Sequence, residues 1–124
     1  IEGLSKIKLL GWIDANLISE YMKNVDVLVL PSYAEGFPNV IVEALWHSLP
    51  VISSDVGSIS DSVINDYNGN LFAPGDIDAL KGLMENLVLN NQTIKIYSEN
   101  SLKIAKKNHS FDKNCEKLLK LISN

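Results

Sequence analysis

The chain has 124 residues, of which 46% are hydrophobic and 21% are charged, a composition typical of one globular domain and not of a disordered segment. Its net charge of −4 argues against nucleic acid as the main partner. No apolar run approaches the roughly 20 residues that a membrane helix needs, and the first residues lack the build of a signal peptide.

Short apolar runs alternate with longer helical patterns along the chain. The predicted strands occupy residues 7–11, 25–30, 51–54 and 70–73. The predicted helices between them occupy residues 14–23 and 39–48, with a helical turn at residues 58–64. Continuous apolar strands separated by helices indicate βαβ units, and the sequence therefore predicts an α/β fold with a parallel sheet covered on both faces.

The rest of the chain is predicted to be a helical tail. It carries two apolar stripes at helical spacing, Ile77, Leu80, Met84, Leu87 and Val88 in one and Phe111, Cys115, Leu118, Leu119 and Ile122 in the other. We expect both stripes to face the core, and Asp76 to cap the first helix. Cys115 is the single cysteine of the sequence and cannot form an internal disulfide, so we expect a reducing, cytoplasmic location.

Ligands of open α/β sheets bind at the carboxyl ends of the strands, near helix N-termini. The segments at such positions are residues 11–14, 31–39, 55–60 and 73–76, and the second is the most informative. Gly36 permits close backbone approach there, and Pro38 fits a first helical turn, where its missing N–H costs little. The free amides of Asn39 and Val40 then form an anion site suited to a phosphate.

Two glutamates flank this helix start. Glu35 lies just before it, and Glu43 lies one turn into the helix, where its carboxylate could accept hydrogen bonds from a sugar diol. Most helix starts of α/β proteins bind nothing, and most helical glutamates are solvated, so geometry alone leaves a structural and a functional interpretation open. No glycine-rich dinucleotide or phosphate motif follows a strand, and neither His47 nor His109 has a second ligand at metal-binding spacing.

Several ordered blocks of the sequence closely resemble the donor-site core of glycosyltransferase family 4. These blocks are residues 25–32, 35–40, 43–44 and 49–52, followed at the expected distances by residues 55–57, 68–69 and 74–76. Glu35 and Glu43 have the spacing of that family's E-x7-E motif. The resemblance covers about residues 7–120 and implies a Rossmann-like sheet, the C-terminal donor-binding domain of the GT-B fold.

The resemblance also implies an activity. A family member of this kind is a retaining glycosyltransferase that moves a sugar from a UDP- or GDP-type donor to an acceptor such as a polysaccharide or glycolipid precursor. No metal or other cofactor is expected, because protein dipoles and basic side chains stabilise the departing diphosphate. Peripheral association of the complete enzyme with a membrane is a further expectation.

The site residues that the resemblance implies are Gly11, Trp12, Ile13, Glu35, Gly36, Phe37, Pro38, Asn39, Val40 and Glu43. Glu43 would bind the ribose hydroxyls, while the amides around Asn39 and Val40 would cradle the diphosphate. Glu35 would lie close to the anomeric centre as the catalytic residue, with the neighbouring Gly36-Phe37 backbone on the donor sugar. The backbone of residues 11–13 would lie near the base.

The sequence departs from the family pattern in three places. Ser48 stands where a glycine usually ends the helix, and residues 57–61 differ from the usual glycine-rich loop. The family also has an acceptor-binding domain and two strands of the donor domain, with an Arg and a Lys, before this region. Residues 1–124 are therefore expected to be a single partial domain, inactive alone, that pairs its exposed edges, self-associates or joins the missing part.

Two other functions stay open at this point. The first is a non-catalytic α/β module that binds a nucleotide or assembles with a partner. The second is a GT-B relative with different chemistry, such as a nucleotide-sugar epimerase or a sugar phosphorylase, against which the Glu35–Glu43 block argues.

Overall fold

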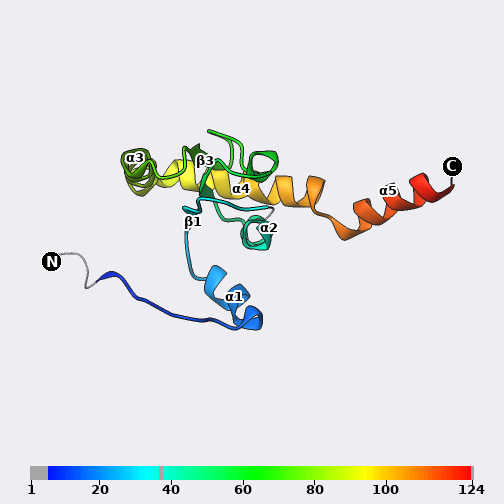
Figure 1. Ribbon diagram of the computed structural model, residues 1–124, viewed down its shortest axis with the longest axis horizontal. Coiled ribbons are helices and arrows are strands. Elements are labelled where there is room, and N and C mark those ends of the chain that lie inside the picture. The colour runs from blue at the N-terminus through cyan, green and yellow to red at the C-terminus, as the bar shows by residue number, and fades with distance from the viewer. Residues whose placement is uncertain (1–5, 37, 124) are drawn as a thin grey trace.

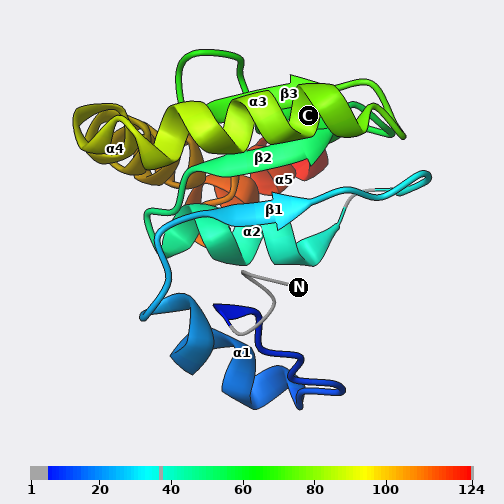
Figure 2. The same ribbon diagram turned by 90° about the vertical axis from the view of Figure 1, so that its left-hand side faces the viewer.

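The protein folds around three parallel strands, as a computed structural model of residues 6–36 and 38–123 shows. The strands are β1 (Leu28–Leu30), β2 (Val51–Ser54) and β3 (Gly69–Phe72), in the order β1-β2-β3. Because all three run in the same direction, their carboxyl ends meet at one edge of the sheet (Figure 2). All four residues of β2 are buried, which fits its central position.

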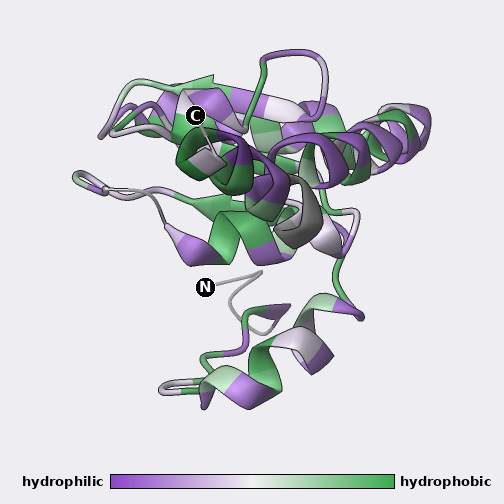
Figure 3. Cartoon of the chain, turned by 90° about the vertical axis from the view of Figure 1, so that its right-hand side faces the viewer, coloured by the Kyte–Doolittle hydropathy of each residue, from purple (hydrophilic) through white to green (hydrophobic). Residues whose placement is uncertain are grey.

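Helices cover both faces of the sheet, as the sequence predicts. α2 (Asn39–Trp46) lies on one side of the strands and α3 (Ile77–Val88) on the other, while α4 (Asn91–Asn108) packs against both helices (Figure 1). Val51 and Ile52 are neighbours in β2, so they point to opposite faces and enter two separate hydrophobic cores. Figure 3 shows hydrophobic residues concentrated in the strands and α2, with mixed hydropathy on the outer helices.

Each core joins helices to one face of β2. Val51 packs with Ile41 and Leu45 of α2 and with Ile104 of α4, all of them buried. On the other face, a second cluster contains Ile52, Phe72, Leu87 and Tyr97. The two helices that begin at the carboxyl edge, α2 and α3, are therefore anchored by apolar contacts to the same central strand.

The remaining elements lie at the ends and in the connections. α1 (Ala15–Met22) precedes β1, the 3-10 helix η2 (Ile59–Asp61) follows β2, and α5 (Phe111–Ser123) ends the chain. α1 contributes Met22 to the core beside α2, and its Ser19 Oγ lies 3.0 Å from Nε2 of His47, just after α2. His47 therefore packs at the end of α2 that lies away from the carboxyl edge of the sheet.

The first predicted strand is wrong. Residues 7–11 have no regular secondary structure, and Leu9 is 92% exposed. A strand is stabilised by a neighbouring strand, and within the described ranges none lies beside this segment. The other three predicted strands are present, although the one expected at residues 25–30 is shortened to β1.

The prediction that both apolar stripes of the tail face the core is also wrong in part. In α3 Leu87 is buried and Leu80 packs beside it, but Ile77 and Val88 are 76% and 75% exposed. In α5 the leucines and isoleucine of the stripe are exposed, because this helix extends away from the body of the protein (Figure 1). Periodicity identified the apolar faces correctly, but it could not identify what covers them.

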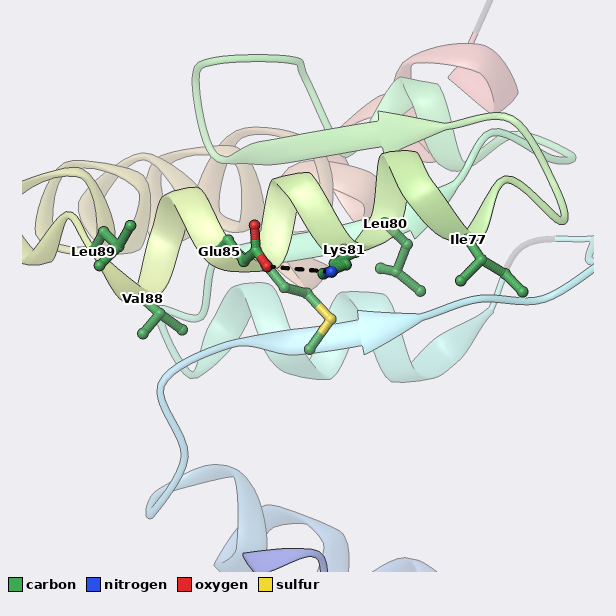
Figure 4. A pocket seen from close by; sticks show the side chains of 7 residues that line it. Ile77, Leu80, Lys81, Glu85, Val88 and Leu89 are labelled. Atoms are coloured by element: carbon green, nitrogen blue, oxygen red, sulfur yellow. Dashed lines mark ion pairs between the residues drawn. The ribbon is translucent and has the colours of Figure 1, made fainter. Parts of the chain in front are cut away.

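The exposed side of α3 continues toward the free edge of β1. A groove of about 650 Å³ runs along α3. It is lined by the side chains drawn in Figure 4, those of Ile77, Leu80, Lys81, Met84, Glu85, Val88 and Leu89. A second hollow of about 250 Å³ lies between α3 and the β1 strand and includes Val27, Val29 and Met84. β1 has no neighbouring strand on its outer side among the described residues, so apolar surface and a free strand edge adjoin one another.

We therefore expect the 124-residue chain alone to self-associate through α3 and the β1 edge. Sedimentation velocity at increasing protein concentration should show a monomer in exchange with larger species. Val88→Lys places a charge on the exposed apolar face and should shift the protein toward monomer. Gln92→Lys adds the same charge at an exposed position of α4 and should not, and a wild-type protein that stays monomeric at all concentrations would contradict the expectation.

Gly69 makes the closest backbone approach inside the sheet, and its replacement should destabilise the fold. A Cβ at this position would overlap the carbonyl oxygen of Val51 in the adjacent β2 strand. We expect Gly69→Ala to lower the free energy of unfolding by about 2–3 kcal/mol, because the strands would have to separate. Gly82→Ala in the open interior of α3 should instead raise it by roughly 0.5–1 kcal/mol. Urea unfolding of both variants is the measurement, and equal effects would refute this assignment.

Candidate functional site

Three loops leave the carboxyl edge of the sheet side by side in the strand order. They are residues 31–38 after β1, residues 55–58 after β2 and residues 73–76 after β3. The first leads into the N-terminus of α2 and the third into the N-terminus of α3, so two helix starts lie at this edge (Figure 2). This is the place at which parallel α/β sheets bind ligands.

The side chain of Glu35 is held by a hydrogen bond within the first loop. The Ser32 hydroxyl donates to its Oε1 atom over 2.8 Å, and the side chain of Glu35 is half-buried. The hydroxyl of Ser54, at the end of β2, donates in turn to the backbone carbonyl of Ser32. Ser54 is fully buried, so the first loop is fixed to the central strand.

The second loop packs directly against the first. Gly57 has a φ of +55°, and a Cβ there would overlap the carbonyl oxygens of both Glu35 and Gly36. The amide of Ser58 donates to the Gly36 carbonyl over 3.4 Å. Only glycine combines this left-handed backbone with so close an approach. Gly57 therefore packs tightly on the backbone of Glu35, while Ser32 binds its side chain.

The start of α2 has open amides. Pro38 is the N-cap, in extended conformation, and a proline has no side-chain acceptor with which to cap the helix. The first amide bonded within the turn is that of Ile41, which donates to the Pro38 carbonyl over 3.1 Å. Asn39 is exposed and Val40 is half-buried, so this helix start is accessible. It fits the anion site that the sequence predicts.

Glu43 lies one helical turn beyond Asn39. Residues four apart share a face of a helix, so its carboxylate lies on the same side of α2 as Asn39. Glu43 is half-buried, and it forms no hydrogen bond or ion pair with the residues that the structure describes. The structure thus brings Glu35, Gly36, Pro38, Asn39, Val40 and Glu43 into one loop and the first turns of α2. Phe37 lies outside the described residues.

Gly11, Trp12 and Ile13 form a separate segment before α1. Trp12 is 92% exposed, and none of the hydrogen bonds among the described residues joins this segment to the three loops. Gly11 has a φ of +66°, and the chain bends at Trp12 directly after it. Their place beside a base stays a prediction.

The site contains features that sequence reasoning did not find. Tyr33 packs on Gly75 of the third loop, where a Cβ would lie 3.2 Å from the tyrosine ring, and it borders a small hollow of about 80 Å³. A larger hollow of about 300 Å³ adjoins Asp55 and Pro74 at the same edge. The contacts of Ser32, Ser54 and Gly57 were not foreseen either. The available signal for Ser54 was the pair of serines, Ser53 and Ser54, that follows the apolar Val51 and Ile52 in β2.

The chemistry of the edge is acidic and lacks cations. All eleven basic residues of the chain are lysines, and none falls within residues 31–38, 55–60 or 73–76. Within the described part of the chain, no group of three or more His, Cys, Asp or Glu side chains could hold a metal ion. The charged groups that the first loop and α2 offer to a ligand are therefore carboxylates, together with the helix dipole.

Known proteins share both the sequence and the fold. A family model described as Glycosyl transferases group 1 matches residues 2–109. An uncharacterized glycosyltransferase of Methanocaldococcus jannaschii is 36% identical over 105 residues, which are 85% of this chain and 30% of that relative. The sucrose-phosphate synthase of Thermosynechococcus elongatus superposes with a TM-score of 0.86 at 25% identity, over 96% of this chain and 30% of its own.

Another solved structure of the same fold was determined with a nucleotide. HepE of Anabaena, in complex with UDP, has a TM-score of 0.86 at 24% identity, over 97% of this chain and 33% of its own. The chain thus spans about a third or less of the length of these relatives. Its parallel sheet flanked by helices matches the GT-B glycosyltransferase structures. Because the family model covers residues 2–109, the chain belongs to the group 1 glycosyltransferases.

Proposed function

We propose that this chain is the donor-binding part of a retaining glycosyltransferase of family 4 that uses a UDP- or GDP-type sugar donor. The observation that carries the proposal is the open start of α2 at Asn39, with an unpaired, half-buried Glu43 one turn along and a fixed Glu35 just before it. A structural helix start needs neither carboxylate. The UDP in the solved structure of HepE supports a nucleotide-sugar as the ligand.

Each group at the site has a part in this proposal. The amides of Asn39 and Val40, at the positive end of the α2 dipole, accept the diphosphate. The carboxylate of Glu43 accepts hydrogen bonds from the two ribose hydroxyls, which a carboxylate can do with both oxygens. Glu35 and the Gly36-Phe37 backbone contact the sugar near its anomeric carbon, and Pro38 fixes the direction of the helix start.

The transfer breaks the bond between the anomeric carbon and the diphosphate oxygen, so negative charge grows on the leaving group. The helix start stabilises that charge without any metal ion, because its dipoles are already oriented. The loops at this edge carry no cation of their own. The basic side chains that complete the neutralisation therefore belong to other parts of the enzyme, and the chain alone has little or no activity.

The complete enzyme has more parts than this chain, which spans 30% of its Methanocaldococcus relative. We propose that a separate domain supplies the acceptor, a polysaccharide or glycolipid precursor, and that residues 1–124 are part of the donor domain. Cytoplasmic location and peripheral membrane association belong to the same proposal. No helix among the described residues is long and apolar enough to cross a membrane.

A non-catalytic nucleotide-binding or assembly module is the alternative, and the exposed apolar face of α3 favours it. Calorimetry of the complete protein with UDP, GDP and ADP separates the two. The proposed transferase binds UDP or GDP in preference to ADP, whereas an assembly module binds none of them.

Glu43→Ala in the complete enzyme should weaken nucleotide-sugar binding by roughly 10- to 100-fold. The reason is the loss of the charge-assisted hydrogen bonds to the ribose, and a net loss of about 1.5–3 kcal/mol corresponds to this change in affinity. Titration calorimetry with the UDP- or GDP-sugar is the measurement. Glu99→Ala, at an exposed position of α4, is the matched control and should bind like the wild type. Equal affinity of Glu43→Ala and the control would remove the ribose assignment.

Glu35→Ala should depress turnover more than donor binding. A group beside the anomeric centre acts mainly as charge develops in the transition state, so we expect a loss of roughly 100-fold in kcat with a change of only a few-fold in KM. Steady-state kinetics of nucleotide release measures both constants. An increase in KM at constant kcat would mean that Glu35 only binds the donor.

A further inference from the structure

We infer that Ser32 is a positioning residue for the Glu35 carboxylate, and that Ser54 holds Ser32 in place. The inference rests on the proposed function, because it takes Glu35 to be the group that faces the anomeric centre. It adds two residues outside the expected set of donor contacts.

Two hydrogen bonds in series carry this inference. The Ser54 hydroxyl donates to the backbone carbonyl of Ser32, and the Ser32 hydroxyl donates to Oε1 of Glu35 over 2.8 Å. The Ser54 hydroxyl also lies 3.4 Å from the carbonyl of Leu30, so it joins the last residue of β1 and the start of the loop to β2. The series therefore runs from the central strand of the sheet to one oxygen of a carboxylate.

The first residue of this series lies in the buried central strand of the sheet. Ser54 is fully buried, with an accessible fraction of 0%, and its backbone pairs with Phe72 of β3. A buried hydroxyl without a partner is costly, so its bond to Ser32 is strongly favoured. Ser54 thus fixes the start of the loop relative to the sheet.

Glu35 is restrained both at its backbone and at its side chain. Gly57 packs against the backbone of Glu35, where a Cβ would overlap the carbonyl oxygen, while Ser32 binds the side chain. Oε2 of Glu35 forms no hydrogen bond within the described part of the chain. The arrangement engages Oε1 and leaves Oε2 for the substrate. An isolated serine in a loop bonds to its own backbone more commonly than to a carboxylate three residues on.

Fixed orientation matters because a carboxylate on a loop has several rotamers of similar energy. Catalytic groups must be held within a fraction of an ångström of the productive geometry, and freedom to rotate lowers turnover without changing how the donor binds. The Ser32 hydroxyl therefore contributes to kcat and not to KM. A residue that only stabilised the fold would change neither constant in the folded enzyme.

The test is the kinetics of donor hydrolysis by the complete enzyme, with UDP-glucose and GDP-mannose as probes and water in place of the acceptor. In this reaction water attacks the anomeric carbon, the bond to the diphosphate breaks, and the free nucleotide is measured. Ser32→Ala should lower kcat roughly tenfold and leave KM within twofold of the wild type. Ser32→Thr keeps the hydroxyl and should restore kcat, while Ser32→Cys, a weak donor of similar size, should lie between them.

A double-mutant cycle and a control complete the experiment. Ser32→Ala should cause no further loss in the Glu35→Ala background, because the two residues act as a unit. Ser98→Ala removes a hydroxyl that bonds only to its own helix, at the Ile94 carbonyl, and should leave kcat unchanged. Urea unfolding of each variant verifies that it is folded, and Ser32→Thr against Ser32→Cys remains a valid comparison if the alanine variant does not fold.

The outcomes distinguish the two levels of the proposal. If Glu35→Ala loses turnover and Ser32→Ala does not, the positioning role is overturned and the proposed function stands. Equal losses from Ser32→Ala in both backgrounds also overturn it, since the serine would then act independently of Glu35. If Glu35→Ala is as active as the wild type, both the positioning role and the proposed site assignment are refuted.

Discussion

The burial of β2 between two parallel neighbours is the constraint on which the rest of the structure depends. Its residues alternate between two cores, so α2 is anchored on one face and α3 on the other. Gly69 allows β3 to approach Val51 closely, and the parallel direction of all strands brings three loops to one edge. Ser54 and Gly57, at and just beyond the end of β2, then fix the loop that carries Glu35. The position of the candidate site is therefore a consequence of strand packing.

Much of this could be predicted from the sequence because local patterns determine it. An apolar run closed by Pro31 and the Pro38-Asn39 start of a helix are short-range signals, and β1 and α2 are present near the expected residues. The strand expected at residues 70–73 is also present, one residue earlier, as β3. The helix start and the two glutamates could be recognised for the same reason, since all of them lie within nine consecutive positions of one segment.

The predictions that were wrong or missing concern contacts between segments that are distant in the sequence. Residues 7–11 have the apolar character of a strand. They form no strand because no other described strand lies beside them to share backbone hydrogen bonds. Val88 and Leu119 fit a helical core stripe and are exposed, because periodicity reports which face is apolar and not what covers it. The Ser32–Glu35 bond and the packing of Gly57 depend on how two loops meet, which no local pattern encodes.

The proposed chemistry needs more charge than the loops of the candidate site supply. The loops at the carboxyl edge offer carboxylates and helix dipoles but no lysine or arginine, while a diphosphate leaving group needs both dipoles and cations. In the part of the chain that the structure describes, the unpaired outer edge of β1 adjoins the apolar surface of α3. The candidate site is thus accessible at one edge of the sheet, while the exposed apolar surface of α3 and β1 lies elsewhere on the chain. Both properties fit the proposal that the chain is part of a larger enzyme.

The most direct measurement is a crystal structure of the complete enzyme with its nucleotide-sugar bound. The account predicts diphosphate oxygens within hydrogen-bonding distance of the Asn39 and Val40 amides, and the ribose hydroxyls on the Glu43 carboxylate. A nucleotide bound elsewhere, for example along α3, with the start of α2 unoccupied, would contradict it.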